Sequence, residues 1–200
     1  MVLSEPNQPT PIILEDLAPN LGFPRFLDQP GPSSYRIRTD WMQQPTGRES
    51  RQVHNLGMPD TLDADRMVVC EVIVPAGNWS GSPSHKHDCY VPGKESTLEE
   101  IYYFESAVTR GATTAASSPF GYFRGTSADS RPYDVAEEIH SGDVALVPYG
   151  WHGPAAAGPG YDLYFFNVMA GPDPERAWNA TDHPDQAWIR QTWQSQQTDP

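Results

Sequence analysis

The segment Met67-Val68-Val69-Cys70-Glu71-Val72-Ile73-Val74 is a run rich in β-branched residues, and Pro75-Ala76-Gly77-Asn78 ends it. Branched side chains favour extended backbone, and a cluster of proline, glycine and asparagine is a turn signal. The segment therefore predicts a β-strand that ends in a tight turn. How often this pattern is repeated along the chain decides the fold class.

Short runs of the same kind follow, separated by turn signals. They predict strands at residues 101–104, 120–124, 135–139, 144–147 and 161–169. No helical pattern lies between them, and only residues 186–194 show weak helical spacing. The 21 prolines and 16 glycines suit many short strands and are poorly tolerated in helices. The sequence therefore predicts an all-β fold, an antiparallel sandwich or barrel.

The first sixty residues differ from the rest of the chain because they are rich in proline and carry few apolar patterns. Short elements are expected at residues 11–17 and 34–38. We predict an N-terminal arm over residues 1–60, with partial disorder as the alternative, and a barrel with a C-terminal tail over residues 61–200.

The charge balance excludes several classes of partner. Twenty-six acidic and 13 basic residues give a formal net charge of −13, which disfavours binding to a phosphate backbone. No apolar stretch approaches the roughly 18 residues that a membrane span requires. The start of the chain lacks the basic and apolar regions of a signal peptide, and two cysteines make no disulfide framework. We expect a cytoplasmic protein that binds neither nucleic acid nor membrane.

Two of the six histidines, His85 and His87, are spaced two residues apart. Residues i and i+2 of a strand point to the same face, about 6–7 Å apart, so two imidazoles can converge on one cation while Lys86 faces the other way. Two further features follow: the segment Leu98-Glu99-Glu100-Ile101-Tyr102-Tyr103, and His152 just beyond a predicted strand and its turn. The order of these features predicts a metal site.

This order resembles the two motifs of the cupin superfamily. The first motif is H-x-H followed by a glutamate near the start of the next strand. The second is G-x5-P-x-G-x-x-H or a close variant, and this chain has Gly142-x5-Pro148-x-Gly150-x-His152. The fold that the resemblance implies is an antiparallel double-stranded β-helix, also called a jelly-roll barrel.

The sequence is also similar to one family within that superfamily, 5-deoxy-glucuronate isomerase, which is related to 4-deoxy-5-ketouronate isomerase. The similarity covers about residues 50–190. The segments that carry it include His85-Lys86-His87-Asp88, Leu98 to Tyr103, Asn167-Val168-Met169-Ala170-Gly171-Pro172 and Arg176-x-Trp178. Members of that family have a second, N-terminal barrel, whereas at most sixty residues precede the matched region in this chain.

The resemblance implies a ligand set of His85, His87, Glu100 and His152 around one divalent transition metal: Zn, Mn, Fe, Co or Ni. Glu99 is the poorer carboxylate candidate because strand alternation turns it to the opposite face. The implied reaction is aldose–ketose isomerisation of a deoxy-hexuronic acid, 5-deoxy-glucuronate to 5-dehydro-2-deoxy-gluconate in inositol catabolism. Tyr102 and Lys86 are the candidate catalytic residues. Lys86, Arg124 and Arg176 are the candidate cations for the substrate carboxylate.

Two other functions use the same residues. One is a different metal-dependent cupin enzyme, such as a dioxygenase, and the other is a non-catalytic sugar-binding cupin. We also expect a homo-oligomer, most simply a dimer, because a small barrel leaves an apolar sheet face and a proline-rich arm can cover a partner's edge strand. Light scattering would detect this assembly.

Overall fold

A computed structural model describes residues 2–3, 34–39, 49–109 and 118–198 of the chain. Its elements are almost all strands, and every strand pair is antiparallel. The strands of the larger sheet are β1 (Val2–Leu3), β2 (Ser34–Thr39), β3 (Arg51–Asn55), β4 (Val68–Val74), β9 (Glu99–Val108), β12 (Val144–Val147), β14 (Tyr161–Ala170) and β16 (Trp193–Thr198).

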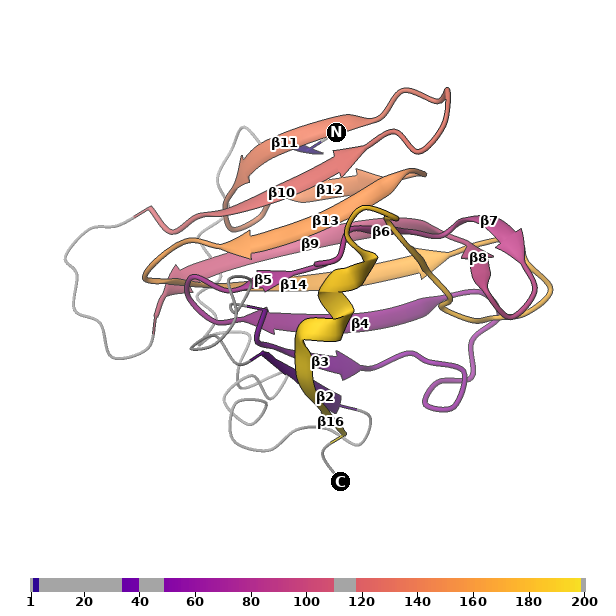
Figure 1. The fold of residues 1–200 in the computed structure, drawn as a ribbon, viewed down its shortest axis with the longest axis horizontal. Helices are drawn as coiled ribbons and strands as arrows, with labels where there is room; N and C mark the ends of the chain where they lie inside the picture. The colour runs from indigo at the N-terminus through magenta and orange to yellow at the C-terminus, as the bar shows by residue number, and fades with distance from the viewer. Residues whose placement is uncertain (1, 4–33, 40–48, 110–117, 199–200) are drawn as a thin grey trace.

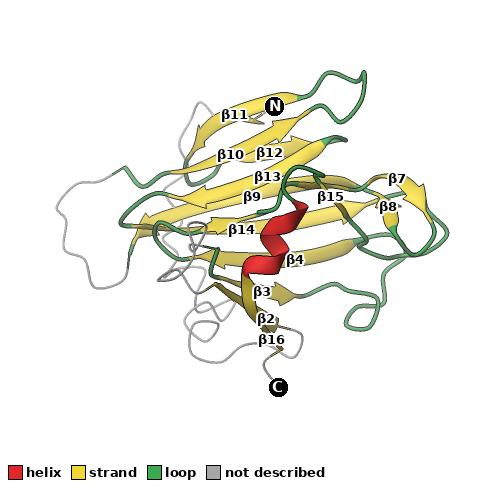
Figure 2. Cartoon of the chain, in the orientation of Figure 1, coloured by secondary structure: helices red, strands yellow, loops and turns green. Residues whose placement is uncertain are grey.

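A second sheet and a small hairpin complete the described part of the chain. The second sheet contains β5 (Trp79–Ser80), β6 (His85–Lys86), β10 (Gly121–Thr126), β11 (Asp134–Ile139), β13 (Trp151–Ala157) and β15 (Thr181–Asp182), and the hairpin pairs β7 (Asp88–Val91) with β8 (Glu95–Thr97). The helix drawn in red in Figure 2 is the 3-10 helix η1 (Ala187–Thr192). Within these residues no helix is long and apolar enough to cross a membrane.

The strand order is that of a jelly roll. The larger sheet runs β1-β12-β9-β14-β4-β3-β2-β16, and the smaller runs β11-β10-β13-β6-β15 (Figure 1). Four central strands of the first, β12-β9-β14-β4, therefore face four strands of the second, β11-β10-β13-β6, as in a double-sheet jelly roll. The predicted all-β, antiparallel barrel is confirmed.

The core lies between the inner faces of the two sheets. Along β4, Val68, Cys70, Val72 and Val74 point into it, as strand alternation requires. Aromatic rings from both sheets meet at its centre: the Phe123 ring of β10 lies 4.9 Å from Tyr102 and 5.7 Å from Phe104 of β9. Packing of these aromatic rings thus fixes the position of β9, which carries Glu100 and Tyr102, relative to the smaller sheet.

The predicted strands correspond to β4, β9, β10, β11, β12 and β14, and the element expected at residues 34–38 is β2. Residues 11–17 lie outside the described part of the chain. The described residues of the predicted arm contain β1, β2 and β3, all of which extend the larger sheet. The division of the chain at residue 60 stays a prediction.

Candidate metal centre

Three buried or half-buried imidazoles meet on the inner side of the smaller sheet. His85 belongs to β6, His87 follows directly after it, and His152 is the register partner of His85 on β13. Ring centroids lie 4.5 Å apart for His85 and His152 and 4.7 Å apart for His87 and His152. Their ligand nitrogens all lie within 4.8 Å of one another. The structure therefore brings together the three histidines that the sequence singled out.

His152 lies just beyond β12 and the bend over residues 148–150, as the sequence predicted, and it is the second residue of β13, a strand that was not predicted. The segment carries Gly153 and Pro154, residues that are uncommon inside strands. The consequence for the site is favourable, because a histidine within a sheet is held more rigidly than one in a loop.

Glu100 reaches the cluster from the opposite sheet. Its Oε2 lies 3.1 Å from His87 Nε2 and 3.1 Å from His152 Nε2. Glu100 is 2% exposed, whereas the preceding Glu99 is exposed on the other face of β9. Strand alternation had selected Glu100 over Glu99, and the placement of the two carboxylates agrees with it.

The backbone orients all three imidazoles in the same sense. Nδ1 of His87 lies 3.1 Å from the Leu98 carbonyl oxygen, Nδ1 of His152 lies 3.1 Å from that of Gly150, and Nδ1 of His85 lies 3.3 Å from that of Pro83. Carbonyl oxygens only accept, so these contacts assign the proton of each neutral ring to Nδ1 and leave the lone pair on Nε2. This is the arrangement of metal-ligating histidines.

A divalent cation fits this donor set. With their protons on Nδ1, His87 and His152 each present an Nε2 lone pair to the carboxylate of Glu100. Hydrogen-bond acceptors therefore face one another with no proton between them. Among the described residues, His152 Nε2 is buried without a hydrogen-bond partner. Such a group is costly unless a cation or a proton lies beside it. Three imidazoles and a carboxylate suit a borderline transition metal.

The local environment holds His85 and Glu100 in the protonation states that bind metal. Burial lowers the pKa of His85 well below its usual value, and the neighbouring His152 and His87 lower it further. Burial alone would raise the pKa of Glu100, but its contacts with His152 and His87 outweigh this and bring the pKa well below its usual range. His85 is therefore neutral and Glu100 is charged at neutral pH.

Asn167 is a site residue that the sequence reasoning missed. It lies on β14, pairs in register with Tyr102 of β9, and its Nδ2 donates a hydrogen bond to Glu100 Oε1. The bond fixes the carboxylate so that Oε2 faces the histidines. The available signal was a polar residue at an inward-facing position of an otherwise apolar strand.

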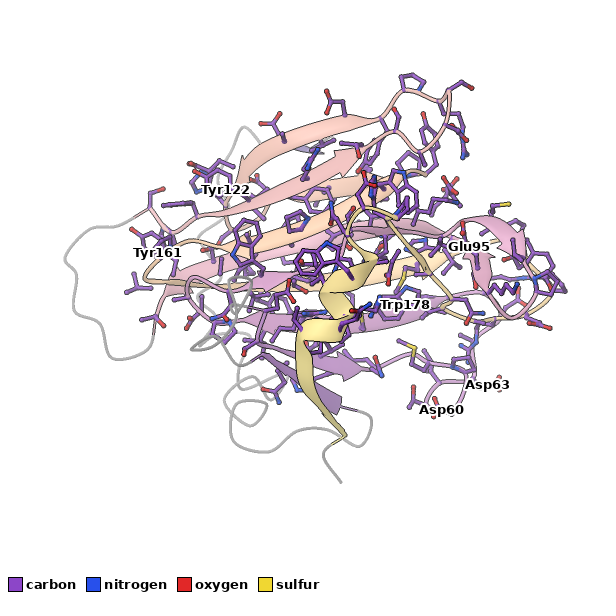
Figure 3. All side chains as sticks on the ribbon, in the orientation of Figure 1. Asp60, Asp63, Glu95, Tyr122, Tyr161 and Trp178 are labelled. Carbon is purple, nitrogen blue, oxygen red and sulfur yellow. The ribbon has the colours of Figure 1, made fainter. Side chains whose placement is uncertain are left out.

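A cavity of about 270 Å³ opens beside the cluster. His85, Tyr102 and Asn167 lie along it, so the imidazole cluster and the cavity share one wall. Trp178, labelled in Figure 3, is another lining residue. The remaining lining residues are Arg51, Val53, Cys70, Val72, Ser80, Gly81, Ser82, Pro83, Gly153, Ala155, Phe165, Ala180, Arg190 and Trp193.

The two candidate catalytic residues lie in different places. Tyr102 lines the cavity, with its ring centroid 6.3 Å from that of His152, and burial together with the charge of Glu100 raises its pKa well above the usual value. Its phenol is therefore a proton donor at neutral pH. Lys86 is absent from the cavity lining: its Nζ lies 2.6 Å from Asp88 Oδ1 and 2.6 Å from Glu95 Oε1 (Figure 3 labels Glu95).

The cations expected to meet a substrate carboxylate are also elsewhere. Arg124 is exposed on β10, and the Arg176 guanidinium donates to the Met58 and Met67 carbonyl oxygens. The arginines that do line the cavity are Arg51 of β3 and Arg190 of η1. Neither was predicted, because they lie more than 130 positions apart in the predicted arm and tail, and only the folded chain brings them together.

These two arginines share an aromatic neighbour. The guanidinium carbons of Arg51 and Arg190 lie 5.3 and 4.7 Å from the centroid of the Trp193 ring. Arg190 also makes a two-pronged ion pair with Asp182, and Trp193 Nε1 donates to Glu49 Oε2 at 3.0 Å. One part of the cavity wall is therefore cationic and aromatic, which suits a carboxylate on a small polar ligand.

Comparisons with known proteins agree with this architecture. The family model "KduI/IolB family" matches residues 38–189. The 5-deoxy-glucuronate isomerases of Geobacillus thermodenitrificans and Geobacillus kaustophilus are 36% and 37% identical over 177 residues, or 88% of this chain. The solved structure of an IolB-like protein from Salmonella typhimurium is 38% identical, covers 78% of this chain and superposes with a TM-score of 0.62.

The match covers only part of the length of each relative. It covers 58% and 57% of the two Geobacillus proteins and 52% of the Salmonella protein, so the chain spans about half the length of the relatives that it matches. The matched region contains the complete histidine cluster, Glu100 and Asn167. On the family match, the sequence identity and the shared fold, this chain is a member of the KduI/IolB family.

Proposed function

We propose that the chain is a metal-dependent aldose–ketose isomerase that acts on 5-deoxy-glucuronate. The observation that carries the proposal is a buried His85–His87–His152–Glu100 cluster that opens onto a cavity with arginines in its wall. The family supports the choice of reaction, since the relatives named above are 5-deoxy-glucuronate isomerases.

The four clustered residues would hold one divalent ion of Zn, Mn, Fe, Co or Ni. When bound, such an ion supplies positive charge that stabilises the negative charge developing on substrate oxygens as a carbon-bound proton is removed beside the carbonyl. The chain's own part is preorganisation: backbone carbonyls fix the imidazoles, and Asn167 fixes the carboxylate.

We infer that the substrate lies with its carbonyl end at the histidines and its carboxylate at Arg51 and Arg190. Guanidinium groups bind carboxylates through paired N–H donors. Arg190 already holds Asp182 with two N–H groups, and Arg51 donates to the Glu49 carbonyl oxygen, so both guanidinium groups are held in the wall of the cavity. Trp178 and Trp193 supply apolar wall for the deoxygenated carbon.

Tyr102 is proposed as the hydrogen-bond donor to a substrate oxygen. It lines the cavity, and its raised pKa keeps the proton on the phenol throughout the neutral range. A hydroxyl that donates to an oxygen gaining negative charge stabilises the transition state more than the ground state. Lys86 is not proposed to contact the substrate, because its ammonium group pairs with Asp88 and Glu95.

The experiment measures substrate conversion and oxygen consumption in the same sample. Metal-loaded protein is incubated with 5-deoxy-glucuronate while aldehyde loss and dissolved oxygen are followed together. Aldehyde loss without oxygen uptake, abolished by a chelator and restored by metal, is the expected result. Oxygen uptake that matches substrate loss would establish the dioxygenase instead. Saturable binding without turnover would establish a sugar-binding protein.

A further inference from the structure

We propose that Asp88 is a positioning residue for the metal centre, because its carboxylate ties the segment that carries His87 to the turn that orients His152. The inference rests on the metal centre proposed above. Asp88 is the first residue of β7 and follows His87 directly in the chain. Its side chain is 4% exposed, although it lies outside the histidine cluster and outside the cavity.

The link to His152 runs through Gly150. Asp88 Oδ2 accepts a hydrogen bond from the Gly150 N–H at 3.0 Å, and the Gly150 carbonyl oxygen lies 3.1 Å from His152 Nδ1. The N–H and the carbonyl group of Gly150 flank the same Cα atom. Only the φ and ψ torsions of Gly150 therefore separate the group that Asp88 holds from the group that orients the imidazole.

Gly150 makes that link necessary. Its φ is +91°, a conformation that glycine adopts readily but does not prefer over others. A Cβ at this position would lie 2.6 Å from the Thr126 carbonyl oxygen, so the chain needs glycine here. Glycine has no side chain to restrict its backbone torsions. The hydrogen bond from the Gly150 N–H to Asp88 supplies that restriction.

Two cations hold the Asp88 carboxylate in turn. Lys86 Nζ lies 2.6 Å from Oδ1, and an Arg131 terminal nitrogen lies 3.0 Å from Oδ2. Lys86 also bonds Glu95 of β8, and Glu95 Oε1 accepts the Asp88 backbone N–H at 3.2 Å. Asp88 is thus the centre of an ion network on the side of the sheet opposite the cluster. This gives Lys86 a structural place in a site where the sequence suggested a catalytic one.

Asp88→Asn is the direct test, with Asp129→Asn as its matched control. An asparagine has one acceptor oxygen and cannot serve Gly150 and the two cations together. Asp129 also pairs with Arg131, at 2.7 Å, but it is half exposed and makes no bond to the Gly150 turn. The control therefore removes the same charge from the same arginine without touching the link to His152.

The readout is metal binding by the metal-free protein, not turnover. Cobalt(II) is titrated against a competing chelator well below the melting temperature, and the visible spectrum of the loaded protein reports ligand geometry. Asp88→Asn is expected to bind cobalt about 10–100-fold more weakly and to shift the visible bands, the range typical for loss of a group that orients a metal ligand. Asp129→Asn is expected to stay within about twofold of wild type, with unchanged bands, because Asp129 makes no bond to the turn that orients His152.

Equal cobalt affinity and an unchanged spectrum in Asp88→Asn would overturn the inference while leaving the metal centre intact. A wild-type chain that binds no cobalt would overturn the metal centre itself, and this inference with it. If Asp88→Asn does not fold, Arg131→Gln replaces it, since that change keeps the Gly150 bond but removes one of the two cations that hold the carboxylate. Weaker binding in Arg131→Gln than in Asp129→Asn supports the inference, and equal binding refutes it.

Discussion

His152 is the residue on which the metal centre depends most. It is 0% exposed, its Nδ1 is directed at a carbonyl oxygen, and its Nε2 has no hydrogen-bond partner among the described residues. We predict that His152→Ala leaves purified protein with little bound metal, whereas His183→Ala, which lies outside the cluster, keeps it. Metal per chain is measured by mass spectrometry. Full occupancy in His152→Ala would show that the fourth ligand is assigned wrongly.

Tyr102 carries the second prediction at this scale. Tyr102→Phe removes only the hydroxyl of this cavity-lining side chain, so we expect kcat to fall about 10²-fold, a usual cost for losing one donor to a developing charge. Metal content should not change. Tyr133→Phe is the control, because that buried phenol donates to the Leu146 carbonyl oxygen and does not line the cavity. Equal kcat in the Tyr102 variant and wild type would remove Tyr102 from the reaction.

Local spacing predicted part of the site. His85 and His87 stand out because they are two residues apart, and alternation along one strand separated Glu100 from Glu99. Arg51, Asn167 and Arg190 gave no such signal. Each comes to the site through pairings between segments distant in sequence, as when β14 places Asn167 beside Tyr102. Asp88 was visible in the motif, but its bond to Gly150 crosses 62 positions.

Among the elements, the long apolar strands were predictable, whereas β6 and β13 were not. β4 and β14 are runs whose burial is visible in the sequence. β6 has two residues, and β13 contains Gly153 and Pro154, so neither has the pattern of a strand. β6 pairs with β13 at His85 and His152, and β13 also pairs with β10. Two of the four proposed ligands, His85 and His152, therefore lie on elements that tertiary contacts impose.

The turn before β13 supports a prediction about stability. Gly150→Ala places a Cβ in a left-handed conformation and 2.6 Å from the Thr126 carbonyl oxygen, so we expect a loss of about 3 kcal/mol or more in unfolding free energy. Gly160 has a similar φ of +84° but open space around it, and Gly160→Ala should cost only about 1 kcal/mol. Urea unfolding compares the two. Equal losses would contradict the close packing of this turn.

At the scale of the whole molecule, Glu105 makes stability depend on pH. It is buried on β9, and burial raises its pKa despite hydrogen bonds from Tyr103 and Ser141. A raised folded pKa contributes stability that is full below the unfolded value of about 4.3 and is lost as pH rises through the folded pKa. Glu105→Gln should therefore flatten the decline in unfolding free energy as the pH rises above about 4.3. An unchanged decline in Glu105→Gln would refute the assignment.

The chain as a whole combines a complete metal cluster with about half the length of its relatives. The central claim is that the metal cluster of this chain carries out the isomerisation proposed above. The most direct test incubates the metal-loaded 200-residue chain with 5-deoxy-glucuronate in deuterated water and follows the carbon-bound protons by NMR. We predict conversion of the aldehyde to a ketone with a new hydroxymethyl group, absent after chelation. An unchanged aldehyde signal in the presence of fully metal-loaded protein would contradict the account.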